Sequence, residues 1–119
     1  MVHHGAALTR ETGAPALAEA VASGNFDRLP ERMSRLCAYA LKLTLQPWDM
    51  REEDLRPVRR LGMSDRDIVD ANQVVAYFNY VNRVADGLGV ELEPYWPEEV
   101  RAKRTYGVRG PRGSAPGSR

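Results

Sequence analysis

The chain has little cysteine and no long apolar segment, and both shortages narrow what it can be. Its single cysteine, Cys37, excludes a disulfide within the chain. No apolar run approaches the roughly 20 residues that a membrane-spanning helix needs. The amino-terminal region also lacks the basic and then apolar pattern of a secretion signal. We therefore expect a cytoplasmic protein with no membrane partner.

The chain also lacks an excess of charge of either sign. Its 17 Lys and Arg residues nearly cancel its 16 Asp and Glu residues, so the net charge gives no support to nucleic-acid binding. With 119 residues, the chain accommodates one domain at most. We place a helical domain at residues 1–94 and an extended arm with a disordered tail at 95–119. The tail from Arg101 is rich in Gly, Pro, Ser and Arg, and it holds too little apolar surface to offset the entropy of ordering.

Apolar residues recur at helical spacing through most of residues 1–94, which predicts an all-α fold. Helices are expected over residues 2–12 and 15–24, with Pro15 at a first helical position and Gly24 as a terminator. The segment "PERMSRLCAYALKLTLQP" predicts a stronger helix that begins near Pro30 and ends at Pro47. Cys37 lies in the apolar stripe of this helix, and we interpret it as a buried, unreactive thiol.

Two further helices are expected between residue 54 and residue 87. The first begins near Asp54, because Pro57 is tolerated only in a first helical turn, and it ends at Gly62. The second opens with Ser64 as N-cap and Asp67 three residues later. This second helix is apolar on two sides, with one stripe at Ile68, Ala71, Val75, Phe78 and Asn82 and another at Val74, Tyr77, Val81 and Val84. It should therefore be buried on two sides, either between neighbouring elements or in a subunit contact.

Three polar residues, Asn79, Asn82 and Arg83, interrupt this otherwise apolar helix. Polar side chains need hydrogen-bond partners when they are buried. They either line a functional site or join neighbouring helices or subunits, and we favour the structural interpretation.

Residues 36–94 resemble the carboxyl-terminal half of the peroxidase-related branch of the AhpD-like, carboxymuconolactone-decarboxylase-like superfamily. The resemblance is carried, in order, by "YALKLT", "DLRPVRRLGMSDRDIVD" and "YFNYVNRVADGLGVELEP". It implies that the chain is the carboxyl-terminal portion of an AhpD-like helical bundle. It also implies a homo-oligomer, because the family assembles as dimers, trimers or hexamers. We expect residues 65–87 to contribute heavily to this assembly.

The stretch "HHGAAL" near the amino terminus resembles the continuation of that family's redox motif. In the family, a C-x-x-C pair is followed after three residues by a histidine, and His4 matches this proton-relay histidine. His3 matches the position before it and is a possible participant. The second motif cysteine would fall immediately before Met1, and the glutamate of the family's proton relay would lie further upstream. The cysteine pair is absent from the sequence, and Cys37 matches an ordinary core position on another helix.

Three hypotheses for function follow. The first is a thiol-dependent peroxidase-related oxidoreductase that is inactive as this chain, because a histidine assists a thiol and does not replace one. It implies an external thiol reductant and a native chain that extends upstream to the cysteine pair. The second is a non-catalytic helical homo-oligomer or regulatory assembly protein. The third is the carboxymuconolactone decarboxylase-type chemistry found elsewhere in the superfamily.

No cofactor or metal is expected. Adjacent residues on a helix point about 100° apart, so His3 and His4 do not chelate one ion together. The sequence offers no third ligand at metal-site spacing. Surface histidines without a role are the remaining interpretation of the pair.

Overall fold

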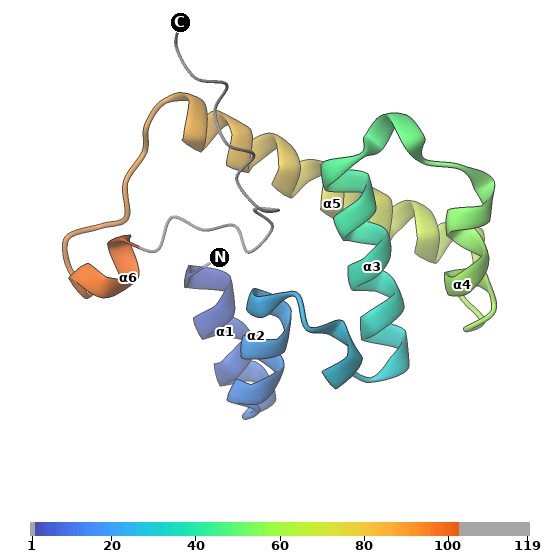
Figure 1. Cartoon of the computed structure of the whole chain (residues 1–119), viewed down its shortest axis with the longest axis horizontal. Coiled ribbons are helices and arrows are strands. Elements are labelled where there is room, and N and C mark those ends of the chain that lie inside the picture. The colour runs from blue at the N-terminus through green and yellow to red at the C-terminus, as the bar shows by residue number, and fades with distance from the viewer. Residues whose placement is uncertain (1, 103–119) are drawn as a thin grey trace, which may run out of the picture. The chain divides into compact units, whose positions relative to one another are not determined.

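The computed structural model describes residues 2–102, and side chains are described for residues 4–101. Helices and turns account for this part of the chain, which contains no strand, so the predicted all-α class is confirmed. The described residues fall into two compact units, residues 2–24 with 93–102 and residues 25–92 (Figure 1). The predicted domain boundary at residue 94 stays a prediction. From residue 103 onward, the predicted tail lies outside the described residues.

The first unit contains two helices joined by a tight turn, α1 (Val2–Thr12) and α2 (Pro15–Ser23), which contact each other. Both were predicted from the sequence and are confirmed. Pro15 lies in the first turn of α2, where its missing N–H breaks no helical hydrogen bond. Gly24 then ends α2 at φ 72°, a left-handed conformation that glycine adopts without steric cost. Local backbone chemistry therefore fixes both ends of α2.

The same unit includes residues 93–102, which end in the short helix α6 (Glu98–Ala102). Arg101 Nε donates a hydrogen bond to the Trp96 carbonyl at 3.0 Å and joins this helix to the preceding turn. Arg101 was predicted to begin the disordered tail, and this is wrong for Arg101 and Ala102, which are helical.

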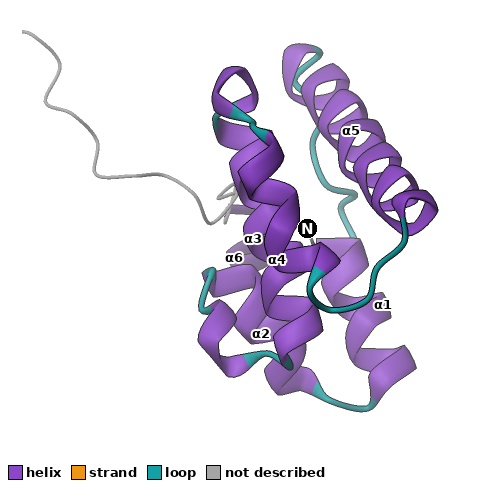
Figure 2. Cartoon of the chain, turned by 90° about the vertical axis from the view of Figure 1, so that its right-hand side faces the viewer, coloured by secondary structure: helices purple, strands orange, loops and turns teal. Residues whose placement is uncertain are grey.

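The second unit is built on two helices that lie side by side, α3 (Glu31–Leu45) and α5 (Asp65–Gly87) (Figure 2). A short 3-10 turn, η1 (Phe26–Arg28), precedes α3. The polar contacts between the helices advance in the same direction along both, from Tyr39 with Asn72 to Thr44 with Asn79. Because the helices run in the same sense, the chain must return from the end of α3 to the start of α5.

Residues 46–64 make this return through η2 (Pro47–Asp49), η3 (Glu52–Leu55) and α4 (Arg56–Arg59). The helix predicted from Asp54 therefore begins earlier, as a 3-10 turn, and becomes α-helical only at Arg56. Pro57 lies in the first turn of α4, and Gly62 follows with φ 80°, as the sequence predicted. The three acidic residues of η3 precede this helix, where its dipole favours them.

The core of the second unit forms where α4 and the start of α5 meet α3. Val58, Met63 and Ile68 are buried, and Leu36 and Leu55 pack against them. Val58 is the most enclosed of these, with 2% of its surface exposed. Ser64 caps α5 directly beside this cluster, because its Oγ accepts from the Asp67 N–H at 3.2 Å while Asp67 Oδ2 accepts from the Ser64 N–H at 2.8 Å. The predicted capping box is confirmed, and it fixes where α5 begins.

Candidate functional site

His4 lies in the first turn of α1, and its side chain is exposed. His3 precedes it on the same helix, and its side chain lies outside the described part of the chain. The N-terminal end of a helix favours negative charge, because unpaired backbone N–H groups and the helix dipole meet there. A thiolate is such a charge. The position of His4 is therefore compatible with the predicted proton relay, which stays a prediction.

Cys37, the only thiol of the sequence, lies on α3 in the second unit. Its side chain is half-buried, and this burial raises the pKa of the thiol. A raised pKa disfavours the thiolate, which is the form that attacks peroxides and disulfides. Cys37 was predicted to be buried and is only half-buried, whereas its raised pKa agrees with the interpretation of an unreactive thiol.

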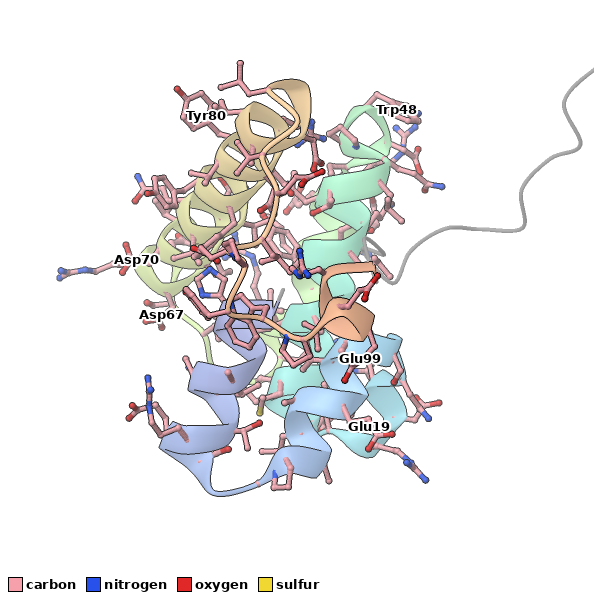
Figure 3. All side chains as sticks on the ribbon, turned by 90° about the vertical axis from the view of Figure 1, so that its left-hand side faces the viewer. Glu19, Trp48, Asp67, Asp70, Tyr80 and Glu99 are labelled. Atoms are coloured by element: carbon pink, nitrogen blue, oxygen red, sulfur yellow. The ribbon has the colours of Figure 1, made fainter. Side chains whose placement is uncertain are left out.

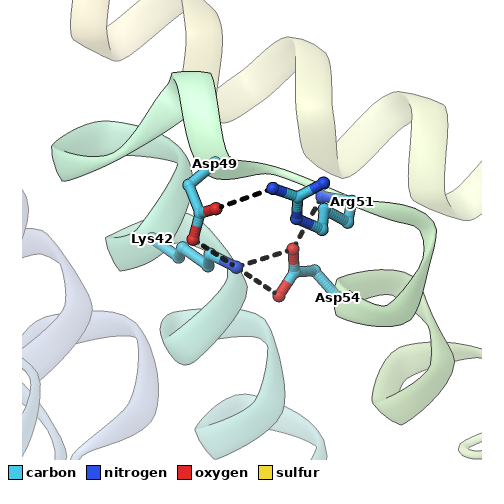
Figure 4. A network of polar contacts seen from close by, with 4 residues as sticks. All are labelled: Lys42, Asp49, Arg51 and Asp54. Atoms are coloured by element: carbon cyan, nitrogen blue, oxygen red, sulfur yellow. Dashed lines mark hydrogen bonds and ion pairs between the residues drawn. The ribbon is translucent and has the colours of Figure 1, made fainter.

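A charged network that sequence analysis missed joins α3 to the return segment (Figure 4). Lys42 Nζ lies 2.8 and 2.9 Å from the two carboxylate oxygens of Asp54 and 3.4 Å from Asp49 Oδ2. Arg51 donates its backbone N–H to Asp54 Oδ2 at 2.8 Å, and its guanidinium lies 3.4 Å from Asp49 Oδ1. The sequence contained one signal for this network. Lys42 lies in the last turn of the predicted helix, and Asp49 and Asp54 follow the terminating Pro47.

The electrostatics of this network favour its charged form. The hydrogen bond to Asp54 raises the pKa of Lys42, and the nearby charge of Asp49 adds to this. The bonds from Lys42 and from the Arg51 backbone lower the pKa of Asp54. An ammonium held protonated is a poor nucleophile, and a carboxylate held ionised is a poor general acid.

The network borders a shallow hollow of about 240 Å³. The hollow is lined by Arg35, Ala38, Tyr39, Lys42, Glu53, Asp54 and Pro57. Two of its charged side chains, Lys42 and Asp54, are already paired with each other. We therefore interpret the cluster as a structural clamp between α3 and η3.

Polar side chains also join α3 to α5. Asn72 Nδ2 donates to the hydroxyl of the buried Tyr39 at 2.7 Å. The Thr44 hydroxyl lies within hydrogen-bonding distance of both the Ala40 carbonyl (2.8 Å) and Asn79 Oδ1 (3.0 Å). The Thr44 hydroxyl has one proton and donates to one of these two oxygens at a time. Together with the Tyr39–Asn72 bond, it satisfies polar groups inside a helix contact. For Asn79, the geometry agrees with the structural interpretation made from the sequence.

Arg83 and Asn82 lie one turn further along α5. Arg83 Nη1 donates to the Asn79 carbonyl at 3.1 Å, within its own helix, and Asn82 is half-buried. The structure does not bring these polar residues of α5 into a cleft with the Lys42 cluster, whose lining comes from α3, η3 and α4.

Two features that the described residues lack bear on the class of site. Between residues 2 and 102, no group of three or more His, Cys, Asp or Glu side chains is placed to hold a metal ion. Within the same described range, no helix has both the length and the apolar character needed to cross a membrane.

Comparisons with known proteins do not identify a family. The sequence matches no protein-family model. No curated protein matches it either. The AhpD-like resemblance of residues 36–94 therefore remains a proposal, supported by the sequence landmarks and compatible with the helical fold.

Proposed function

We propose that the protein is an AhpD-like, peroxidase-related protein in which His4 is the proton-relay histidine, and that this chain alone does not turn over hydroperoxides. The observation that carries the second part is the environment of Cys37. It is the only thiol in the sequence, it is half-buried on α3, and its pKa is raised by burial. The resemblance of residues 3–8 and 36–94 supports the first part.

The chemistry of the family explains why one such thiol is insufficient. A thiolate attacks the hydroperoxide, the O–O bond breaks, and an alcohol leaves with a proton that a histidine delivers. The sulfur becomes a sulfenic acid, and a second thiol attacks it to give a disulfide and water. An external dithiol then reduces the disulfide by exchange. A single thiol with a raised pKa is poor at the first step and has no partner for the second.

The proposal is tested by adding the cysteine pair of the family motif before Met1. The 119-residue protein is assayed with an organic hydroperoxide and a dithiol reductant, and we expect consumption no faster than with reductant alone. A version carrying Cys-Ala-Ala-Cys directly before Met1 should gain turnover. Ser-Ala-Ala-Ser in the same place is the matched control and should not.

His4 provides the second half of the test. In the extended protein, His4→Ala should lower turnover by about 100-fold or more, the usual contribution of a positioned proton-transfer group. His3→Ala should have the smaller effect. Two results contradict the proposal: turnover by the unextended protein that survives Cys37→Ser but disappears in His4→Ala, or an extended protein that cycles its disulfide without consuming peroxide.

A second candidate function, a non-catalytic helical assembly protein, is favoured by a different observation. The apolar stripe of α5 that includes Val74 and Tyr77 is exposed, with 56% and 61% of the respective residue surfaces accessible. A stripe of exposed apolar side chains along one helix of a small protein indicates an interaction surface.

A further inference from the structure

The helix α5 presents an uncovered apolar face on the side opposite to its contacts with α3. The side facing α3 carries Ile68, Asn72 and Asn79. The opposite side carries the exposed hydrophobic residues Val74, Tyr77, Val81 and Val84, and the exposed Leu88 follows directly after the helix. Val69 and Tyr80 are also exposed and flank this face. Figure 3 shows Asp70 and Tyr80 projecting from α5 away from α3. The second apolar stripe predicted from the sequence is therefore real, and in the described chain it is exposed.

The spacing on this face is that of a coiled-coil seam. Alternating steps of four and three residues connect Asp70, Val74, Tyr77, Val81, Val84 and Leu88. This repeat of 3.5 residues keeps one stripe facing a partner helix along its whole length. An apolar face that packs only against a short segment does not need this regular spacing along four turns. The expected occupant is therefore another long helix.

The area of the face fits a dimer. Its five hydrophobic seam residues, between 36% and 77% exposed, present about 500 Å² per copy, comparable to the largest apolar patch of a typical monomer. Two copies would bury about 1,000 Å² in all, the area that a specific protein interface needs. The interior is small, since the buried hydrophobic residues between residues 4 and 101 are Ala20, Leu29, Tyr39, Val58, Met63 and Ile68. A small chain with so little interior gains from association.

The charge at the start of the seam selects the orientation. Asp70 is the only charged residue among the six seam positions. In a parallel pair, the two Asp70 carboxylates would face each other across the interface and repel. In an antiparallel pair centred on Asn79, they lie about 27 Å apart at 1.5 Å per residue, well beyond the Debye length.

We propose that this seam forms an antiparallel homodimer, in which α5 pairs with α5 of a second copy around a twofold axis that crosses the seam at the level of residue 79. In this register, Val74 lies opposite Val84 of the partner subunit, and Tyr77 lies opposite Val81 of the partner subunit. The inference deepens the second candidate function and is independent of the peroxidase proposal. The molecular mass and the gain of peroxide turnover are separate measurements, so a result that refutes one proposal leaves the other unaffected.

The first test measures the mass of the full chain in solution by sedimentation or light scattering over a range of concentrations. We expect twice the chain mass of 13.3 kDa. Tyr77→Glu places an uncompensated charge in the seam and should raise the dissociation constant by about 100-fold or more. Val84→Glu is a second such variant. Ala76→Glu, at an exposed position of α5 outside the seam, is the matched control and should remain dimeric.

The second test fixes the orientation by oxidative cross-linking in a Cys37→Ser background. In the antiparallel register, the two copies of residue 80 lie about 3 Å apart along the helix axis, and the two copies of residue 88 lie about 27 Å apart. Tyr80→Cys should therefore form a cross-linked dimer, and Leu88→Cys should not. Circular dichroism on each variant confirms that its helix content is retained.

Each alternative occupant gives a distinct result, and each would overturn the proposal. A monomer at all concentrations means that the face is covered by another segment of the same chain or by a different protein. A dimer that Tyr77→Glu leaves intact uses another surface. Efficient cross-linking of Leu88→Cys shows a parallel pair.

Discussion

Two substitutions at neighbouring positions test directly which face of α5 packs against the core. Ile68 has 8% of its surface exposed and packs with Val58 and Met63, whereas 53% of Val69 is exposed. One residue along a helix is a turn of about 100°, so the two side chains lie on different faces. Ile68→Ala and Val69→Ala therefore make similar chemical changes in different environments.

The expected magnitudes differ in size and in sign. Ile68→Ala removes three carbon atoms from the core and leaves a partial cavity, which should lower the free energy of unfolding by about 2–4 kcal/mol. The lower half of this range is favoured because Ile68 retains slight exposure and the surrounding cluster is small. Val69→Ala should change stability by less than about 0.5 kcal/mol, and it can be stabilising because alanine has the higher helix propensity.

The assay is urea unfolding followed by circular dichroism at one fixed protein concentration, since association makes stability depend on concentration. Thermal unfolding should show the midpoint of Ile68→Ala falling by about 10 °C or more. An unchanged m-value would show that the variant alters stability and not the compactness of either state. Equal effects of the two substitutions, or a larger effect of Val69→Ala, would refute the placement of α5 on α3 and α4.

Three other outcomes are expected. Because the pKa of Asp54 is lowered, its contribution to stability should be lost as the pH falls below about 4, and because the pKa of Lys42 is raised, its contribution should be lost as the pH rises above about 10.4. A plot of Tm against pH should therefore be flatter at both ends in a Lys42→Met, Asp54→Asn double variant. Ser64→Ala should lower the free energy of unfolding by about 1 kcal/mol through loss of the α5 cap, whereas Ser64→Asp should retain most of it in the same denaturation assay. The native Cys37 thiol should react with a disulfide reagent more slowly than the same thiol in the denatured protein, and equal rates would contradict its burial.

The helix boundaries were accessible from the sequence because they are set by local chemistry. Pro15 and Gly24 bound α2, Pro47 follows the end of α3, and Ser64 caps α5, each through steric or hydrogen-bonding effects within a few residues. The two-sided apolar pattern of α5 was equally visible, since it depends only on residue type and a 3.6-residue period. The proton-relay role of His4 was predicted by resemblance to a motif and stays a prediction, since it requires a cysteine pair that the sequence does not contain.

The tertiary structure decided what no local rule determines. It showed that α3 and α5 run in the same sense, that one stripe of α5 contacts α3 while the other is exposed, and that Lys42 meets Asp54 across the return segment. Lys42 and Asp54 are 12 positions apart, and Thr44 and Asn79 are 35 apart. Such contacts depend on how complete helices pack, so no short window of sequence contains them. For the same reason, periodicity alone identified two apolar faces of α5, and only the packing of the whole unit showed which one is left exposed.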